Sequence, residues 1–147
     1  MERREFIDIT SKTICACSLG VTGILLKGCS DNDSMPVEPQ GLEITFDLNE
    51  EGFQDLKVNG GSVVTPSNEL DSKGLLLYRD NEIISAYANR CTHASYKLTP
   101  FNDSGLSFCV GHGAQFNTEG VPVTGPATRN LREFETLLED DILTVFG

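Results

Sequence analysis

The stretch GLLLYRDNEIISAYANRCTH, residues 74–93, contains two apolar runs separated by polar residues and ends in a cysteine and a histidine. Short apolar runs on either side of a polar turn predict a β-hairpin. We place the turn of this hairpin around Asp80 and Asn81. The stretch therefore predicts a pair of strands that leads directly into a loop carrying Cys91 and His93.

Similar short runs continue on both sides of this hairpin. They are LEITFDL at 42–48, GLSFCV at 105–110, AQFNTEGVPV at 114–123 and DILTVFG at 141–147. Several short strands separated by turn residues predict an all-β sandwich or a small barrel-like domain.

The segment NLREFETLLEDD, residues 130–141, is ambiguous. Its apolar residues fit the alternation of a strand and also the spacing of a helix. We favour a strand, because Asp140 and Asp141 then form a hairpin turn with ILTVF.

The cysteines and histidines fall into two tight pairs. Of the 5 cysteines, Cys15, Cys17 and Cys29 lie near the N-terminus, which leaves two for the remainder of the chain. Cys91 and His93 form a C-x-H pair, and Cys109 and His112 form a C-x-x-H pair. This inventory allows a disulfide between the two cysteines, which leaves the histidines unexplained. It also suits a tetrahedral structural zinc site or a Rieske [2Fe–2S] cluster.

The wider sequence around these pairs resembles one family. CTH at 91–93 and CVGHGAQFNTEGVPVTGPA at 109–127 are similar to the two cluster-binding loops and the following proline loop of the Rieske iron–sulfur proteins. The resemblance implies a Rieske-type antiparallel β-sandwich with a cluster-binding subdomain formed by these three loops. It also implies one [2Fe–2S] cluster per chain, with Cys91 and Cys109 on a buried iron and His93 and His112 on an outer iron.

By the same resemblance, five further residues surround the cluster: Gly111, Gly113, Ala114, Phe116 and Pro126. The two glycines suit close approach of the backbone to the cluster, with amide N–H groups directed at sulfur. Pro126 belongs to the loop that shields the cluster from a third side.

Four positions depart from the high-potential members of that family. Tyr96 and Gly111 stand where those proteins have a bracing disulfide, and Ala114 and Phe116 stand where they have serine and tyrosine hydroxyls. Hydroxyl donors to sulfur stabilise the reduced cluster and raise its potential. We therefore expect a potential in the lower half of the Rieske range, which runs from about −150 to +300 mV.

The N-terminus has the features of an export signal. A charged start precedes a 14-residue uncharged run at 13–26, which is too short for a lasting membrane span. RREFI at 3–7 resembles a twin-arginine signal, and LLKGC at 25–29 resembles a lipoprotein signal with lipid attachment at Cys29. We expect an export signal at 1–29, a flexible tether at 30–40 and the Rieske domain at 41–147, on the periplasmic or cell-surface side of a membrane.

The net charge of the chain limits the classes of partner that it is expected to bind. The whole chain has a formal charge of −11, and residues 30–147 have 7 Lys/Arg against 19 Asp/Glu, or −12. Such acidity argues against a nucleic-acid partner and favours a basic redox partner, such as a cytochrome or an oxidoreductase subunit.

The leading interpretation is a one-electron carrier and not an enzyme. No histidine is left over for the two-histidine, one-carboxylate iron site of an oxygenase. The alternative is a structural or redox-sensing module whose Cys2His2 set holds zinc or a regulatory cluster.

Overall fold

The computed structural model describes residues 41–147, so the predicted export signal, the tether and Cys29 lie outside the described residues. Within this range lie nine strands and one short 3-10 helix. They are β1 (Glu43–Asp47), η1 (Gln54–Lys57), β2 (Ser62–Val64), β3 (Leu75–Asp80), β4 (Ile83–Ala88), β5 (Ser107–Phe108), β6 (Gln115–Phe116), β7 (Pro122–Thr124), β8 (Glu133–Glu139) and β9 (Ile142–Phe146). No helix in this part of the chain is long and apolar enough to cross a membrane.

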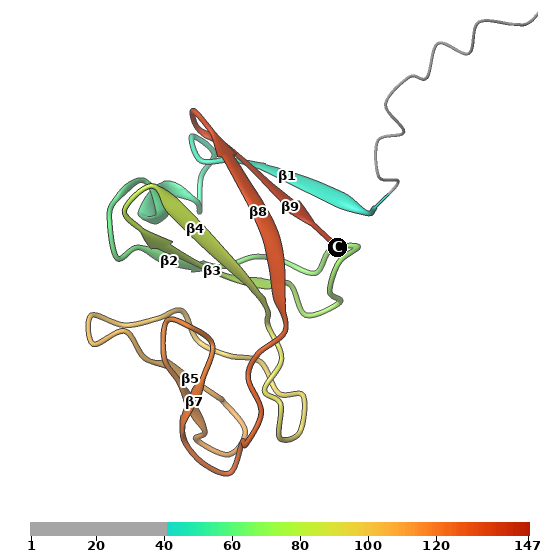
Figure 1. Cartoon of the computed structure of the whole chain (residues 1–147), viewed down its shortest axis with the longest axis vertical. Helices are drawn as coiled ribbons and strands as arrows, with labels where there is room; N and C mark the ends of the chain where they lie inside the picture. The colour runs from blue at the N-terminus through green and yellow to red at the C-terminus, as the bar shows by residue number, and fades with distance from the viewer. Residues whose placement is uncertain (1–40) are drawn as a thin grey trace, which may run out of the picture. The chain divides into compact units, whose positions relative to one another are not determined.

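The strands form two antiparallel sheets, which confirms the all-β prediction. A six-stranded sheet has the order β1-β9-β8-β4-β3-β2, and a three-stranded sheet has the order β5-β6-β7 (Figure 1). Strand β8 pairs with β4 only through residues 133 and 134, and with β9 through residues 135–139. The larger sheet curls at β8, so its two halves face each other across a shared core.

The two predicted hairpins are present. Strands β3 and β4 pair from Leu75 opposite Ala88 to Asp80 opposite Ile83, so the turn is Asn81-Glu82, one residue later than expected. Asn81 has a φ of 54°, a left-handed conformation that asparagine adopts more readily than most residues. The ambiguous segment is strand β8, as favoured, and it turns into β9 at Asp140 and Asp141.

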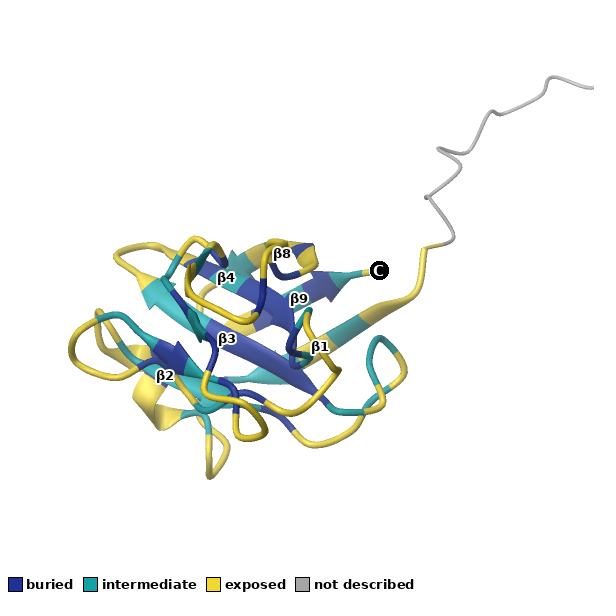
Figure 2. Ribbon diagram, turned by 90° about the horizontal axis from the view of Figure 1, so that it is seen from below, coloured by how far each residue is buried: buried dark blue, intermediate teal, exposed yellow. Residues whose placement is uncertain are grey.

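Two hydrophobic cores lie on opposite faces of β3 and β4. Leu75 and Leu77 belong to a core between the halves of the large sheet, while Leu76 belongs to a second core that also contains Cys91 and Cys109. Successive strand residues point to opposite faces, so a strand covered on both sides can be apolar throughout. This explains the uninterrupted LLL of the opening stretch and the buried colour of β3 in Figure 2.

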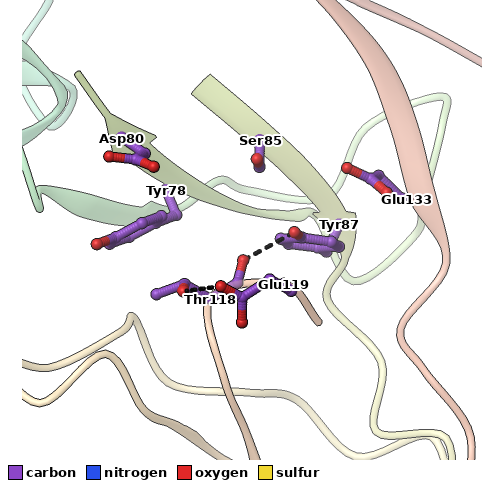
Figure 3. A pocket seen from close by; sticks show the side chains of 7 residues that line it. All are labelled: Tyr78, Asp80, Ser85, Tyr87, Thr118, Glu119 and Glu133. Carbon is purple, nitrogen blue, oxygen red and sulfur yellow. Dashed lines mark hydrogen bonds between the residues drawn. The ribbon is translucent and has the colours of Figure 1, made fainter. Parts of the chain in front are cut away.

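Tyr87 of β4 joins the large sheet to the smaller subdomain. Its hydroxyl donates a hydrogen bond to the Thr118 carbonyl at 2.8 Å, and both residues line a cavity of about 320 Å3 (Figure 3). Burial raises the pKa of Tyr87, and the carboxylates of Glu133 and Glu119 add to this effect. The hydroxyl therefore stays protonated and keeps its role as a donor.

Candidate metal centre

The first loop turns tightly after β4. The Cys91 amide donates to the Tyr96 carbonyl at 2.8 Å, and the Ser95 amide donates back to the Cys91 carbonyl at 2.8 Å. Ser95 takes a left-handed φ of 57° to complete this turn. The loop buries Cys91 and leaves His93 exposed.

The second loop repeats this hydrogen-bond pattern. The Cys109 amide donates to the Ala114 carbonyl at 2.8 Å, and the Gly113 amide donates to the Cys109 carbonyl at 3.0 Å. Gly113 occupies the place that Ser95 has in the first loop and has a φ of 71°, which glycine adopts without strain. Two loops of the same backbone design thus present one cysteine each to the interior and one histidine each to the surface.

Direct contacts hold the two loops side by side. Leu98 and Cys109 form an isolated antiparallel bridge, and the Val110 amide donates to the Lys97 carbonyl at 3.0 Å. The fully buried Asn89 also holds the first loop in place. Its side-chain oxygen accepts a hydrogen bond from the Leu98 amide at 2.8 Å. Its side-chain nitrogen donates to the Lys73 carbonyl at 3.0 Å.

Cys91 and Cys109 are both buried and are not joined by a disulfide. Burial is the largest influence on both thiols and opposes their ionisation. At Cys109 the His112 amide, the Cys91 thiol and the Gly111 amide together outweigh burial and lower its pKa. At Cys91, burial and the hydrogen bond with Cys109 raise the pKa despite the amides of His93 and Ala94. Each sulfur thus has two backbone N–H donors in place to stabilise a thiolate.

The two imidazoles meet at the surface. The Nδ1 atoms of His93 and His112 lie 3.2 Å apart, and the rings are nearly perpendicular at 81°. Two imidazole nitrogens on one tetrahedral metal ion, each about 2.1 Å from it, lie about 3.4 Å apart. The spacing of the two nitrogens therefore suits a shared metal ion.

Comparison with known proteins identifies the family. The family model described as the Rieske [2Fe-2S] domain matches residues 49–135 of this chain. The chain belongs to the Rieske [2Fe-2S] family. Rieske domains bind one [2Fe–2S] cluster per chain, and so does this one. A search of curated protein sequences found no match to this chain.

Solved structures agree with the Rieske fold. The cyanobacterial plasma membrane Rieske protein PetC3 from Synechocystis PCC 6803 is 26% identical, with a TM-score of 0.50 over 64% of this chain and 93% of that one. The Sphingomonas yanoikuyae B1 ferredoxin is 21% identical, with a TM-score of 0.50 over 61% and 88% of the two chains.

The donor set of this Rieske domain fits a two-iron cluster better than a single ion. A structural zinc ion needs four donors around one point. Here two of the four donors are buried thiols and the other two are exposed imidazoles. Donors arranged as one buried thiol pair and one exposed imidazole pair match a cluster in which each iron takes two protein ligands.

The other residues expected around the Rieske cluster lie in or beside the same core. Ala114 and Phe116 are fully buried and pack with the two cysteines. Pro126 is exposed and follows a cis peptide bond, and the next residue, Ala127, enters the core.

Contacts that local sequence does not reveal tie the proline loop to the first loop. The Thr92 hydroxyl donates to the Arg129 carbonyl at 2.7 Å, and the Arg129 side chain donates to the Thr92 carbonyl at 3.3 Å. This link depends on residues 37 positions apart, so no motif within either segment announces it.

Tyr96 and Gly111 are in direct contact. A Cβ atom added at Gly111 would lie 2.4 Å from the Tyr96 ring, and the same ring stands edge-on to His112 with centroids 5.2 Å apart. The Tyr96 ring thus fills the space that a side chain at residue 111 would need. This contact requires a glycine there, in addition to the predicted role of Gly111 beside the cluster. Around Gly113 a Cβ would meet nothing within 4 Å, so backbone conformation is what requires that glycine. An aromatic contact joins the loops where high-potential Rieske proteins are expected to have a disulfide.

We expect Gly111→Ala to destabilise the domain by about 1–3 kcal/mol, the usual cost of overpacking. The added methyl group must displace the Tyr96 ring, which also contacts His112. Urea unfolding of the four proteins of a double-mutant cycle with Tyr96→Ala measures the coupling. The Gly111→Ala penalty should disappear in the Tyr96→Ala background; an unchanged penalty would show that the ring is not its cause.

Proposed function

We propose that Cys91, Cys109, His93 and His112 hold the [2Fe–2S] cluster and that this domain is a one-electron carrier. The observation that supports this most strongly is the pairing of two buried thiols with two exposed imidazoles whose Nδ1 atoms are 3.2 Å apart. Bound there, the cluster supplies a site that accepts and releases one electron. No separate substrate pocket is needed for this role.

Different residues of the chain have different roles at the cluster site. The amides directed at Cys91 and Cys109 stabilise thiolate charge in a buried setting. His93 and His112 are exposed, so a redox partner can approach their rings directly. Asn89 holds the backbone of the first loop, and Tyr96 packs against the second.

We propose a potential in the lower half of the Rieske range, below about +75 mV. Ala114 and Phe116 have no hydroxyl and are packed against the two cysteines, which supports this proposal. Potentiometric titration of the purified protein, followed by visible absorption, should give one wave of one electron. A midpoint typical of the upper half of the range would contradict the proposal.

Phe116→Tyr and Ala114→Ser should each raise the potential, because each adds a hydroxyl donor beside the ligand sulfurs. Leu98→Met, at another buried position of the same core, adds no donor and serves as the matched control. The midpoint should rise in the first two variants and stay unchanged in the third. If neither hydroxyl variant moved the midpoint, the alignment of the second loop would be wrong.

We also propose that the protein is exported and held at a membrane, through lipid on Cys29 or through its N-terminus. The charged start, the short apolar run and LLKGC support this location. A similar structure, PetC3, is described as a plasma membrane Rieske protein. Fractionation of cells that produce the full chain and its Cys29→Ala variant tests the location.

A further inference from the structure

Charged side chains are unevenly distributed over the domain. Residues 41–147 carry 7 Lys/Arg and 16 Asp/Glu. The segment 90–132, which contains the three loops, holds four of these cations and two of the carboxylates. The other residues hold three cations and fourteen carboxylates. The part of the chain that carries the cysteines and histidines is therefore positive, although the protein as a whole is strongly negative.

A cavity beside the first loop gathers most of these cations. Its volume is about 470 Å3, and Arg90, Arg129 and Arg132 line it together with His93. Asp71 is the one carboxylate in its wall. Three guanidinium groups against one carboxylate give the cavity an excess of positive charge next to an expected cluster ligand.

The carboxylate in the wall is already paired. The Arg90 Nε lies 2.6 Å from Asp71 Oδ2, and the Asp71 side chain is only 9% exposed. Pairing at this distance neutralises the charge of Asp71, which is nearly buried, with that of Arg90, which is 39% exposed. Asp71 is therefore not free to neutralise the other two arginines.

Arg129 and Arg132 keep their charge available. Arg129 is exposed and donates to the Thr92 carbonyl, and Arg132 lies over the Phe134 ring at 4.7 Å. Residues 41–147 contain two ion pairs, Arg90 with Asp71 and a second one at the far turn between β8 and β9, and neither includes Arg129 or Arg132.

The surface beside the other histidine is apolar. Tyr96 is 46% exposed and its ring lies against His112. Val110, two residues before His112 in the sequence, is 63% exposed. Exposed apolar groups next to unpaired arginines resemble the composition of protein interfaces, in which aromatic residues and arginine are enriched. By contrast, the cavity of Figure 3, at the junction of β4 and the 118–119 turn, contains the carboxylates of Asp80, Glu119 and Glu133.

From this distribution we propose that the redox partner docks at the two histidines through an acidic face, and that one of its carboxylates enters the cavity beside Arg129. The proposal rests on the proposed function and reverses the expectation of a basic partner, which followed from net charge alone. Bidentate pairing of guanidinium with carboxylate provides the specificity. The local field at the docking site, and not the total charge, then governs association.

The test uses small oxidants as charge probes on the full-length holoprotein. Ferricyanide takes one electron from the reduced protein and becomes ferrocyanide; tris(phenanthroline)cobalt(III) takes one electron and becomes its cobalt(II) form. Stopped-flow absorption follows reoxidation across a range of ionic strengths in chloride. If the surface around the two histidines is positive, the rate of reoxidation by ferricyanide should fall as ionic strength rises. The rate of reoxidation by the cobalt complex should increase.

Variants separate the local charge from the total charge. Arg129→Glu should slow ferricyanide about fivefold at 0.1 M ionic strength, from the attraction lost by a trivalent anion about 10 Å away. Arg129→Lys should stay close to the wild-type rate. Lys57→Glu changes the net charge equally, but Lys57 pairs with Asp141 at the β8–β9 turn, at the opposite end of the domain from β5 and β7 (Figure 1). It should alter the rate by less than about 1.5-fold.

Three results would overturn the docking proposal: a ferricyanide rate that rises with ionic strength, equal effects of Arg129→Glu and Lys57→Glu, or inhibition that follows phosphate concentration at constant ionic strength. The last would indicate a site for free anions. A protein that shows no absorption change on reduction and reoxidation would instead contradict the proposed function itself, so the two failures are distinguishable.

Discussion

Cys109→Ser is expected to abolish cluster binding, with iron content falling below about one tenth of the wild-type value. The Cys109 sulfur is buried beside Cys91 and accepts hydrogen bonds from the backbone amides of His112 and Gly111. Serine replaces an ionisable thiol by a hydroxyl that stays protonated, so the buried pair loses half of its thiolate donors. Because metal binding is coupled to folding, the melting temperature should also fall, by about 10 °C or more.

Val110→Ser is the matched control for this variant. It introduces the same residue at the next position of the same loop, where the side chain is 63% exposed. Its iron content, visible spectrum and melting temperature should remain those of the wild type. Full iron content and an unchanged spectrum in Cys109→Ser would show that Cys109 is not a ligand.

Asn89→Leu is expected to destabilise the domain by about 2–5 kcal/mol. Leucine is close to asparagine in size, but it leaves the Leu98 amide and the Lys73 carbonyl without the partners that Asn89 provides. The Leu98 amide is buried and the Lys73 carbonyl is partly buried, and each unpaired buried group costs about 1–3 kcal/mol. The cluster should also be lost faster, since Leu98 bridges to Cys109.

Chemical unfolding of the holoprotein and the rate of cluster bleaching measure these two effects. Asn130→Leu, at an exposed position, is the control and should stay within about 0.5 kcal/mol of the wild type. A change below 1 kcal/mol in Asn89→Leu, with unchanged bleaching, would mean that another group satisfies the two backbone atoms.

Local patterns were sufficient to predict the main strands and the cysteine–histidine pairs. Alternation and turn residues mark β3, β4, β8 and β9, because each hairpin is closed by residues adjacent in sequence. The histidines and domain cysteines could be identified because residues 41–147 contain no other cysteine or histidine. Strand β2 and helix η1 were missed, since three and four residues are too few to show a period.

Long-range contacts account for what the sequence did not reveal. Asn89 looks like a turn residue at the end of a strand, yet its side chain bonds to segments on both sides of it. Tyr96 suggested only the absence of a disulfide, while its packing on Gly111 depends on the juxtaposition of two loops. Net charge likewise did not reveal the cavity lined by three arginines, because these arginines lie up to 42 positions apart in the sequence.

We have proposed that four side chains hold the Rieske cluster: Cys91, His93, Cys109 and His112. Low-temperature EPR of the dithionite-reduced full-length protein, with iron and zinc measured on the same sample, tests it most directly. We predict about two iron atoms per chain, negligible zinc, and a Rieske-type signal whose average g lies below that of ferredoxins with four cysteine ligands. Zinc without iron, or an EPR signal typical of four cysteine ligands, would contradict the account.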